Sequence, residues 1–158
     1  MKRIIIKNLV LFFAGFCTYI TIETIFRGYS YPLCGMMGGL SVVLIDKIND
    51  EISWDVDLLF QALYGSALIT VIEFIVGFIA KYTHIIPIMW DYTDIPFNFN
   101  GIICLPFTVA WLFLSVIAIF VADSINYYVF EDTIVPHYSL FGGLFCITFH
   151  EKKCSNQR

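Results

Sequence analysis

Five long apolar runs constrain this chain more than any other feature of its sequence. They cover residues 4–25, 31–45, 58–80, 102–121 and 136–149. An α-helix rises 1.5 Å per residue and the hydrocarbon core of a bilayer is about 30 Å thick, so such runs suit membrane crossings. Of the 158 residues, 59% are apolar and 14% are charged, against about 45–50% and 25% in soluble domains. The sequence predicts a single integral membrane domain over residues 1–158, an all-α transmembrane bundle of four to five helices.

The two short runs, 31–45 and 136–149, leave the number of crossings open. If all five runs cross and the N-terminus lies inside, Lys and Arg divide into four inside and five outside, although they normally concentrate on the cytoplasmic side. If one short run enters and leaves on the same face, the division becomes seven to two. Either run contains paired glycines, so both a re-entrant segment and a thin, tilted helix fit. We expect a multi-pass protein of the cell membrane with a cytoplasmic N-terminus.

Charge and cysteine spacing exclude several classes of function. The net charge of −4 leaves no basic patch, so we expect no nucleic-acid partner. The acidic stretches 46–57 and 123–132 are expected to be solvated faces. The cysteines have no CxxC or Cys/His spacing, which favours buried structural thiols over a metal site or a disulfide; they are Cys17, Cys34, Cys104, Cys146 and Cys154. No catalytic triad or phosphate loop is recognisable, so the sequence indicates neither catalytic residues nor a cofactor.

Glu73 lies near the middle of the run 58–80. An acid at this depth costs at least ~2.5 kcal/mol, so its side chain should face protein or water. At 100° per residue, small and polar residues share a sector of about 80° with it; they are Ala62, Ser66, Thr70, Gly77 and Ala80. Two interpretations stay open, namely helix packing with a bonded Glu73 and a site for a proton, a cation or a polar substrate.

Glu23 and Arg27 form the second candidate group. An acid four residues before a base is the favourable order for a helical ion pair. The pair is therefore either a satisfied interfacial contact or leaves Arg27 able to bind an anionic headgroup or substrate.

The stretch between the runs 58–80 and 102–121 combines acids, amides, aromatic residues and a proline. Asp91, Asp94, Asn98 and Asn100 offer the oxygen ligands that Mg²⁺ or Ca²⁺ prefers. Their spacing matches no calcium loop, so a turn stabilised by Asp and Asn side chains is favoured and no metal is expected. The aromatic residues have an alternative role as an interfacial belt.

This stretch carries a family resemblance. Residues 90–105, WDYTDIPFNFNGIICL, resemble the W-D-Y-S-x-x-P-x-N-x-x-G-x-I-C-L signature of a bacterial family labelled "putative ABC-transporter type IV", or CmpB-like. Thr93 replaces the serine, and Ile102 stands where the family usually has arginine. Residues 72–78 look like its L-E-Y-x-x-G-x segment, and residues 23–28 look like its E-T-I and R-G elements. The matches cover about residues 20 to 110.

The resemblance implies a transport-related membrane subunit, similar to an ABC permease, that binds a small polar or charged solute. Its substrate-binding candidates are Glu23, Arg27, Glu73, Asp91, Tyr92, Asn98 and Asn100, and its structural motif residues are Trp90, Asp94, Pro96 and Gly101. Glu23, Arg27 and Glu73 would line a cavity beneath the segment 90–101. The implied partners are membrane lipids and a separate ATPase, a second membrane subunit or a second copy of the chain.

Two other classes of function stay open. One is a membrane enzyme for a lipid-linked substrate that uses Asp91 or Asp94 as acid, base or metal ligand. The other is a non-catalytic accessory, regulatory or immunity-type membrane protein, which the small size of the chain favours.

Overall fold

The computed structural model describes residues 2–51, 56–130 and 134–150. These residues form four helices, α1 (Lys2–Arg27), α2 (Pro32–Glu51), α3 (Leu58–Thr83) and α4 (Leu105–Tyr128). Two antiparallel hairpins complete the fold, β1 (Asn98–Phe99) with β2 (Ile103–Cys104) and β3 (His137–Leu140) with β4 (Phe145–Thr148).

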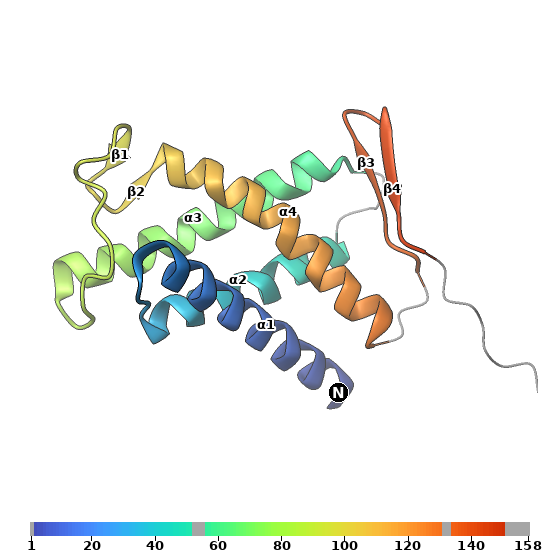
Figure 1. The fold of residues 1–158 in the computed structure, drawn as a ribbon, viewed down its shortest axis with the longest axis horizontal. Coiled ribbons are helices and arrows are strands. Elements are labelled where there is room, and N and C mark those ends of the chain that lie inside the picture. The colour runs from blue at the N-terminus through green and yellow to red at the C-terminus, as the bar shows by residue number, and fades with distance from the viewer. Residues whose placement is uncertain (1, 52–55, 131–133, 151–158) are drawn as a thin grey trace, which may run out of the picture.

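Successive helices run in alternating directions, so the bundle has two distinct ends (Figure 1). The N-terminus and the β3–β4 hairpin lie at one end, which we call the hairpin end. The chain between α3 and α4, residues 84–104, lies at the opposite end and contains β1 and β2. We call these residues the connecting segment and their end of the bundle the segment end.

The helices expected over residues 4–25, 58–80 and 102–121 are confirmed as α1, α3 and α4. Within the described residues, these three helices are long and apolar enough to cross a membrane. The run 31–45 belongs to α2, which is longer than expected and continuous over 20 residues. α2 is one unbroken helix from the segment end to the hairpin end (Figure 1), so residues 31–45 contain no break in the backbone, and whether they cross the membrane stays a prediction.

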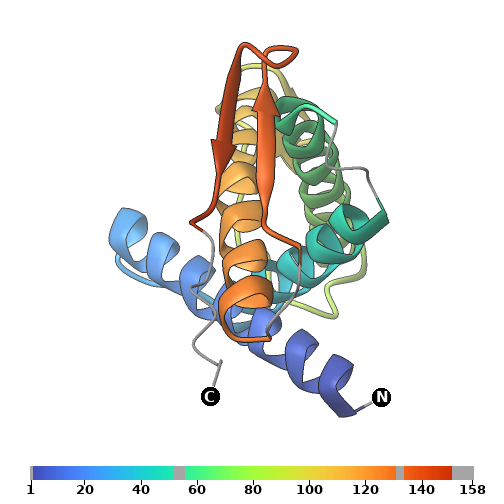
Figure 2. The same cartoon turned by 90° about the vertical axis from the view of Figure 1, so that its right-hand side faces the viewer.

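The fifth helix expected over residues 136–149 is wrong, because these residues form the β3–β4 hairpin. Its turn places Phe141, Gly142 and Gly143 at φ 53°, 67° and 91°, values that no right-handed helix contains. Figure 2 shows the hairpin in front of α4. Tyr138 of β3 is buried and its ring meets that of Phe120 edge-on, with centroids 4.6 Å apart. Apolar composition alone therefore suggested a membrane span, whereas the paired glycines of this run form the turn of a hairpin.

Glycines bring α1 and α2 into close contact. A Cβ on Gly38 would lie 2.5 Å from Cβ of Tyr19, and a Cβ on Gly39 would lie 2.6 Å from the carbonyl oxygen of Phe12. Neither position has room for a side chain. Small residues at a helix interface allow backbones to approach closely, as is common in membrane bundles.

The interface between α3 and α4 contains the small-and-polar face that the sequence predicts. Its buried members on α3 include Ala62, Ser66, Glu73, Gly77 and Ala80. Ser66 Oγ donates a 2.7 Å hydrogen bond to the carbonyl oxygen of Thr108 on α4. The face therefore packs against protein.

The expectation that the acidic stretches are solvated is wrong for Asp46 and Asp123, which are buried. Asp46 Oδ1 accepts a 2.6 Å bond from Asn126 Nδ2, and Lys7 Nζ lies 3.2 Å from Asp46 Oδ2. Asp123 accepts a bond from the hydroxyl of Tyr138. Both acids are inside because other elements bring polar partners to them, α1 and α4 to Asp46 and β3 to Asp123.

The expectation that the cysteines are buried thiols is confirmed for two of the four described cysteines. Cys34 and Cys104 are buried, whereas Cys17 and Cys146 are exposed, and all four are free thiols. Cys154 lies outside the described residues.

We predict that Gly38→Ala lowers the unfolding free energy by about 1–3 kcal/mol, because the new methyl group overlaps Cβ of Tyr19 and forces α1 and α2 apart. Thermal unfolding in mild detergent measures the change. Met36→Leu, on the exposed side of α2, is the control and should unfold like the wild type. Equal melting of the Gly38 variant and the control would contradict close α1–α2 contact.

Candidate functional site

Glu73 joins three parts of the chain at the segment end. The Glu73 residue is 2% exposed. Oε1 accepts a 2.8 Å bond from the Tyr92 hydroxyl of the connecting segment, and Oε2 accepts a 3.0 Å bond from Nε1 of Trp111 on α4. Both oxygens are therefore bonded by neutral donors.

The two donors differ in what they permit. The Trp111 indole N–H can only donate, so Oε2 of Glu73 must remain an acceptor. The Tyr92 hydroxyl can also accept, so the same geometry serves a neutral carboxyl group if the Tyr92 bond reverses. Burial and the adjacent Glu73 carboxylate raise the pKa of Tyr92 well above its ordinary value, which keeps the phenol protonated. The arrangement can hold Glu73 in either protonation state without moving a helix.

Aromatic rings lie around the hydrogen-bonded group of Glu73, Tyr92 and Trp111. Tyr92 stacks on Phe107 with ring centroids 4.6 Å apart and an interplanar angle of 15°. Tyr19 of α1 stacks on Trp111 at 5.9 Å. Aromatic rings thus lie beside both hydrogen bonds of Glu73, and their low local dielectric strengthens these bonds.

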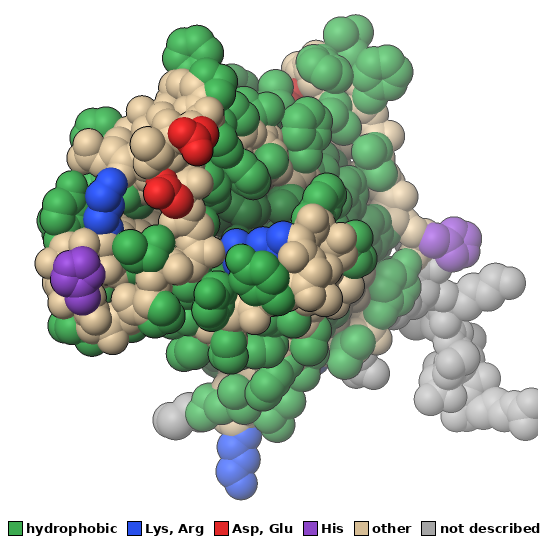
Figure 3. Space-filling model, turned by 60° about the vertical axis from the view of Figure 1, so that its left-hand side comes forward, with side chains coloured by type: hydrophobic (Ala, Val, Ile, Leu, Met, Phe, Trp, Pro, Cys, Tyr) green, Lys and Arg blue, Asp and Glu red, His purple; other side chains and the backbone are tan. Residues whose placement is uncertain are grey.

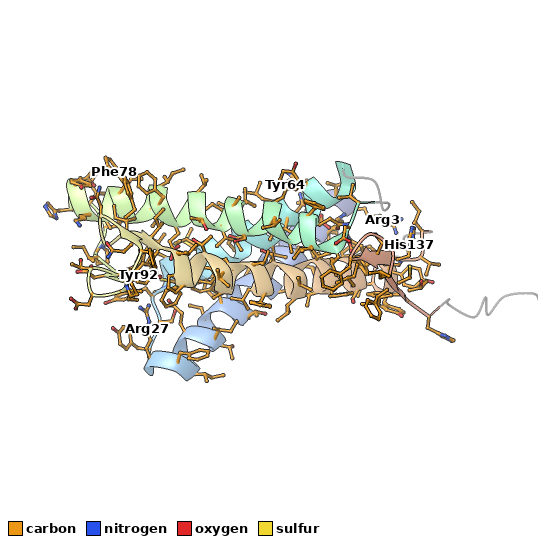
Figure 4. The ribbon with its side chains drawn as sticks, turned by 90° about the horizontal axis from the view of Figure 1, so that it is seen from above. Arg3, Arg27, Tyr64, Phe78, Tyr92 and His137 are labelled. Atoms are coloured by element: carbon orange, nitrogen blue, oxygen red, sulfur yellow. The ribbon has the colours of Figure 1, made fainter. Side chains whose placement is uncertain are left out.

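Arg27 ties the end of α1 to the connecting segment. Its Nη1 donates a 2.9 Å bond to the carbonyl oxygen of Met89, and its Nη2 lies 2.8 Å from Glu23 Oε1. The guanidinium carbon lies 5.0 Å from the ring centroid of Tyr29. Figure 4 shows Arg27 and Tyr92 at the same end of the bundle. The interpretation of Glu23–Arg27 as an ion pair is confirmed, and Arg27 is also bound to the backbone.

Hydrogen bonds within the connecting segment hold its turn. Asn98 Nδ2 donates to the carbonyl oxygen of Ile95 at 2.7 Å, while its Oδ1 accepts from the Gly101 N–H at 3.0 Å. Asp91 Oδ1 accepts from both the N–H and the hydroxyl of Thr93, at 2.9 and 2.5 Å. These bonds from Thr93 hold the pKa of Asp91 below its usual range, so the exposed carboxyl group is ionised at neutral pH. The expected turn stabilised by Asp and Asn side chains is present.

A small cavity of about 50 Å³ lies between the C-terminal part of α3 and the connecting segment. Its walls include Lys81 of α3 and three residues of the sequence motif, Trp90, Asp91 and Gly101. Trp90 is fixed by a 2.9 Å bond from Nε1 to the carbonyl oxygen of Ile102. Figure 3 shows basic and acidic side chains together on this end of the molecule. The cavity therefore offers both charges next to an indole ring.

A second cavity, of about 80 Å³, lies between α1, α2 and α4. Its lining is almost entirely apolar, and its Ser41 hydroxyl is bonded to the carbonyl oxygen of Met37 in its own helix. Tyr19 and Trp111 also border it. Apart from Thr18 and Ser41, its lining side chains are hydrocarbon or aromatic.

The predicted site residues do not form a single cluster. Glu73 and Tyr92 are bonded to each other, Glu23 and Arg27 are paired, and Asp91 borders the small cavity. Asn98 stabilises the turn and Asn100 accepts a bond from Lys81 through its backbone, while Asp94 and Pro96 are exposed. Glu23, Arg27 and Glu73 line neither of the two cavities. Their role in binding a substrate stays a prediction.

Sequence reasoning missed Lys81 and Trp111. Lys81 counted only toward the charge balance, although it follows the small-and-polar face at one helical turn from Gly77. Trp111 sits inside an apolar run and carries no separate signal, because only the packing of α3 on α4 places its N–H beside Glu73. Within the described residues, no group of three or more His, Cys, Asp or Glu side chains could hold a metal ion.

The chain matches a known protein family. The model of a family described as "Putative ABC-transporter type IV" matches residues 14–150. It therefore spans all four helices in large part and reaches the β3–β4 hairpin. No curated protein and no solved structure shows significant similarity to the chain.

We predict that Glu73→Leu lowers the unfolding free energy by about 2–4 kcal/mol, because it leaves the Tyr92 hydroxyl and the Trp111 N–H buried without an acceptor. Glu73→Gln keeps an acceptor for Trp111 and a donor for Tyr92, so it should cost about 1 kcal/mol or less. Denaturation in mixed micelles compares the two variants. A leucine variant as stable as the glutamine variant would show that the hydrogen bonds of Glu73 do not stabilise the bundle.

Gly101→Ala should destabilise the connecting segment more than Gly142→Ala destabilises the hairpin. Both glycines have φ 67°, so the backbone strain of alanine is the same. A Cβ at Gly101 would lie 2.7 Å from Asp91 Oδ1 and 2.6 Å from Thr93 Oγ1, whereas a Cβ at Gly142 meets nothing within 4 Å. We expect a difference of about 1–3 kcal/mol in unfolding free energy between the two variants. Identical melting curves would contradict the tight Asp91–Thr93–Gly101 contact.

Proposed function

Because this chain belongs to the family described as "Putative ABC-transporter type IV", we propose that it is a transport-related membrane subunit, similar to an ABC permease, that binds a small polar or charged solute. The family match over residues 14–150 is the observation that carries this proposal. A separate ATPase would supply the energy of transport, and membrane lipids would surround the helices.

The distribution of polar groups supports a role in handling a solute. Buried acids are costly in a membrane bundle and commonly mark paths for substrates or ions. Glu73 lies beneath the connecting segment, and Asp91 and Lys81 lie at the edge of the cavity beside it. We propose that the connecting segment covers the solute site and that Glu73, through Tyr92, fixes the position of this cover.

The charge distribution supports a cytoplasmic hairpin end in the cell membrane. Among the described residues, Lys2, Arg3, Lys7 and Lys47 belong to the hairpin end, whereas Arg27 and Lys81 belong to the segment end. Basic residues concentrate on the cytoplasmic side of membrane proteins. In this orientation the ATPase would contact the hairpin end and the solute would enter at the segment end.

One observation favours a second candidate function, a non-catalytic accessory or regulatory membrane protein. Both oxygens of Glu73 are bonded by the chain itself, and Arg27 is engaged by Glu23 and Met89. Polar groups that pair within the chain in this way can serve helix packing alone. In that case a larger membrane protein, and no ATPase, would be the stable partner.

Affinity purification from native membranes in mild detergent separates these candidates. We expect a tag on the N-terminus to be accessible only from the cytoplasm, and an ATPase to remain bound to the purified protein. Glu73→Gln, which preserves the packing, should reduce solute uptake at least about tenfold if Glu73 contributes to the solute path. Recovery of only a non-ATPase membrane partner, together with normal uptake in the glutamine variant, would overturn the transport role in favour of the accessory role.

A further inference from the structure

The small cavity at the segment end has the composition of a binding site for a compact charged molecule. It is formed by Gly77, Ala80 and Lys81 of α3, by residues 88–91 and by Gly101 with Ile102. A water molecule needs about 10–15 Å³ of such volume, so about 50 Å³ holds roughly four waters or a solute with a few non-hydrogen atoms. The size of the cavity thus favours a compact solute over a sugar or a peptide.

Two opposite charges border this cavity and keep bonding capacity. Lys81 Nζ has three donors, and one of them bonds to the carbonyl oxygen of Asn100 at 2.5 Å. Asp91 receives both of its bonds from Thr93 on Oδ1. Within the described residues, Oδ2 of Asp91 accepts no hydrogen bond. An ammonium group can therefore bind Asp91 while an anionic group binds Lys81.

The remaining walls suit the carbon skeleton of such a molecule. Met89 is buried, and the indole of Trp90 is held in place by its bond to Ile102. Indole faces attract ammonium and methylated ammonium groups. The cavity thus combines an anion, a cation and an aromatic wall within a space of a few atoms.

We propose that this cavity binds a small zwitterion, such as an α-amino acid of the size of glycine or a compact betaine. The ammonium end faces Asp91 and Trp90, and the carboxylate end faces Lys81. A lone anion would lie beside the like charge of Asp91, and a lone cation would lie beside the like charge of Lys81. A zwitterion is the one class of compact solute that pairs both charges and adds no net charge to the site.

This inference rests on the proposed transport role, because it names the class of solute that the subunit would receive. It also explains why the motif brings Trp90, Asp91 and Gly101 together. Gly101 leaves the space that a side chain would take from Asp91 and Thr93.

The experiment is equilibrium binding of radiolabelled glycine to the full chain in lipid nanodiscs, with acetate and methylammonium as competitors. Each competitor carries one end of glycine. We expect glycine to bind at least about tenfold more tightly than either, because each lost charged hydrogen bond costs about that factor. Acetate or methylammonium competing as well as unlabelled glycine would overturn the assignment and indicate a site for a single ion.

Two variants locate the charges. Asp91→Asn keeps an oxygen for Thr93, so the turn should persist while glycine affinity falls about tenfold or more. Asp94→Asn makes the same charge change at an exposed residue of the same segment that does not border the cavity, and it should bind glycine normally. Equal losses in the two variants would overturn the proposal.

At the other end of the ligand, Lys81→Met should weaken glycine binding, and Lys81→Arg should retain most of it because arginine keeps the charge. If the methionine variant fails to fold, the arginine variant and the Asp91–Asp94 pair still decide the outcome. ATPase co-purification requires neither Lys81 nor Asp91. A failure of glycine binding with a bound ATPase would therefore overturn only the solute class, whereas loss of the ATPase would overturn the transport role alone.

Discussion

The buried carboxyl group of Glu73 is the constraint on which the arrangement of the segment end depends. A carboxyl group at this depth must have hydrogen-bond partners, since an unbonded one would cost several kcal/mol. Tyr92 and Trp111 provide them from two different parts of the chain. Consequently α4 must present one particular face to α3, and the connecting segment must return over the bundle far enough for Tyr92 to reach inward. The position of the connecting segment and the packing of α3 on α4 therefore both depend on one acid, Glu73.

Small residues make this arrangement possible between the helices. The glycines of α2 let α1 lie against it, and the small face of α3 lets α4 approach closely enough for Ser66 to bond to the backbone of Thr108. In a membrane the hydrophobic effect between helices is weak, so packing and interhelical hydrogen bonds must supply the association. The polar residues therefore stabilise the bundle, and a side chain that stabilises helix packing can also contact a solute.

The two ends of the bundle use their charged residues differently. At the hairpin end, Lys7, Asp46 and Asn126 meet in a buried cluster that links α1, α2 and α4. At the segment end, Arg27 bonds to Glu23 and to the backbone, while Lys81 and Asp91 remain at the border of a cavity. The first cluster closes the bundle, whereas the second pair leaves space between its members. This difference supports a solute site at the segment end, as proposed above.

The sequence by itself determined the helical membrane character, three of the long helices, the small-and-polar face around Glu73 and the Glu23–Arg27 pair. These features follow from local periodicity and composition, which a single chain segment carries in full. Tertiary structure alone decided that residues 136–149 form a hairpin, that Asp46 and Asp123 are buried, that Trp111 bonds to Glu73 and that Lys81 borders the small cavity. The partners of Asp46 lie 39 residues before it and 80 residues after it, and the donors to Glu73 come from elements separated from it by 19 and 38 residues. No periodicity encodes such contacts, because they exist only once the helices have packed.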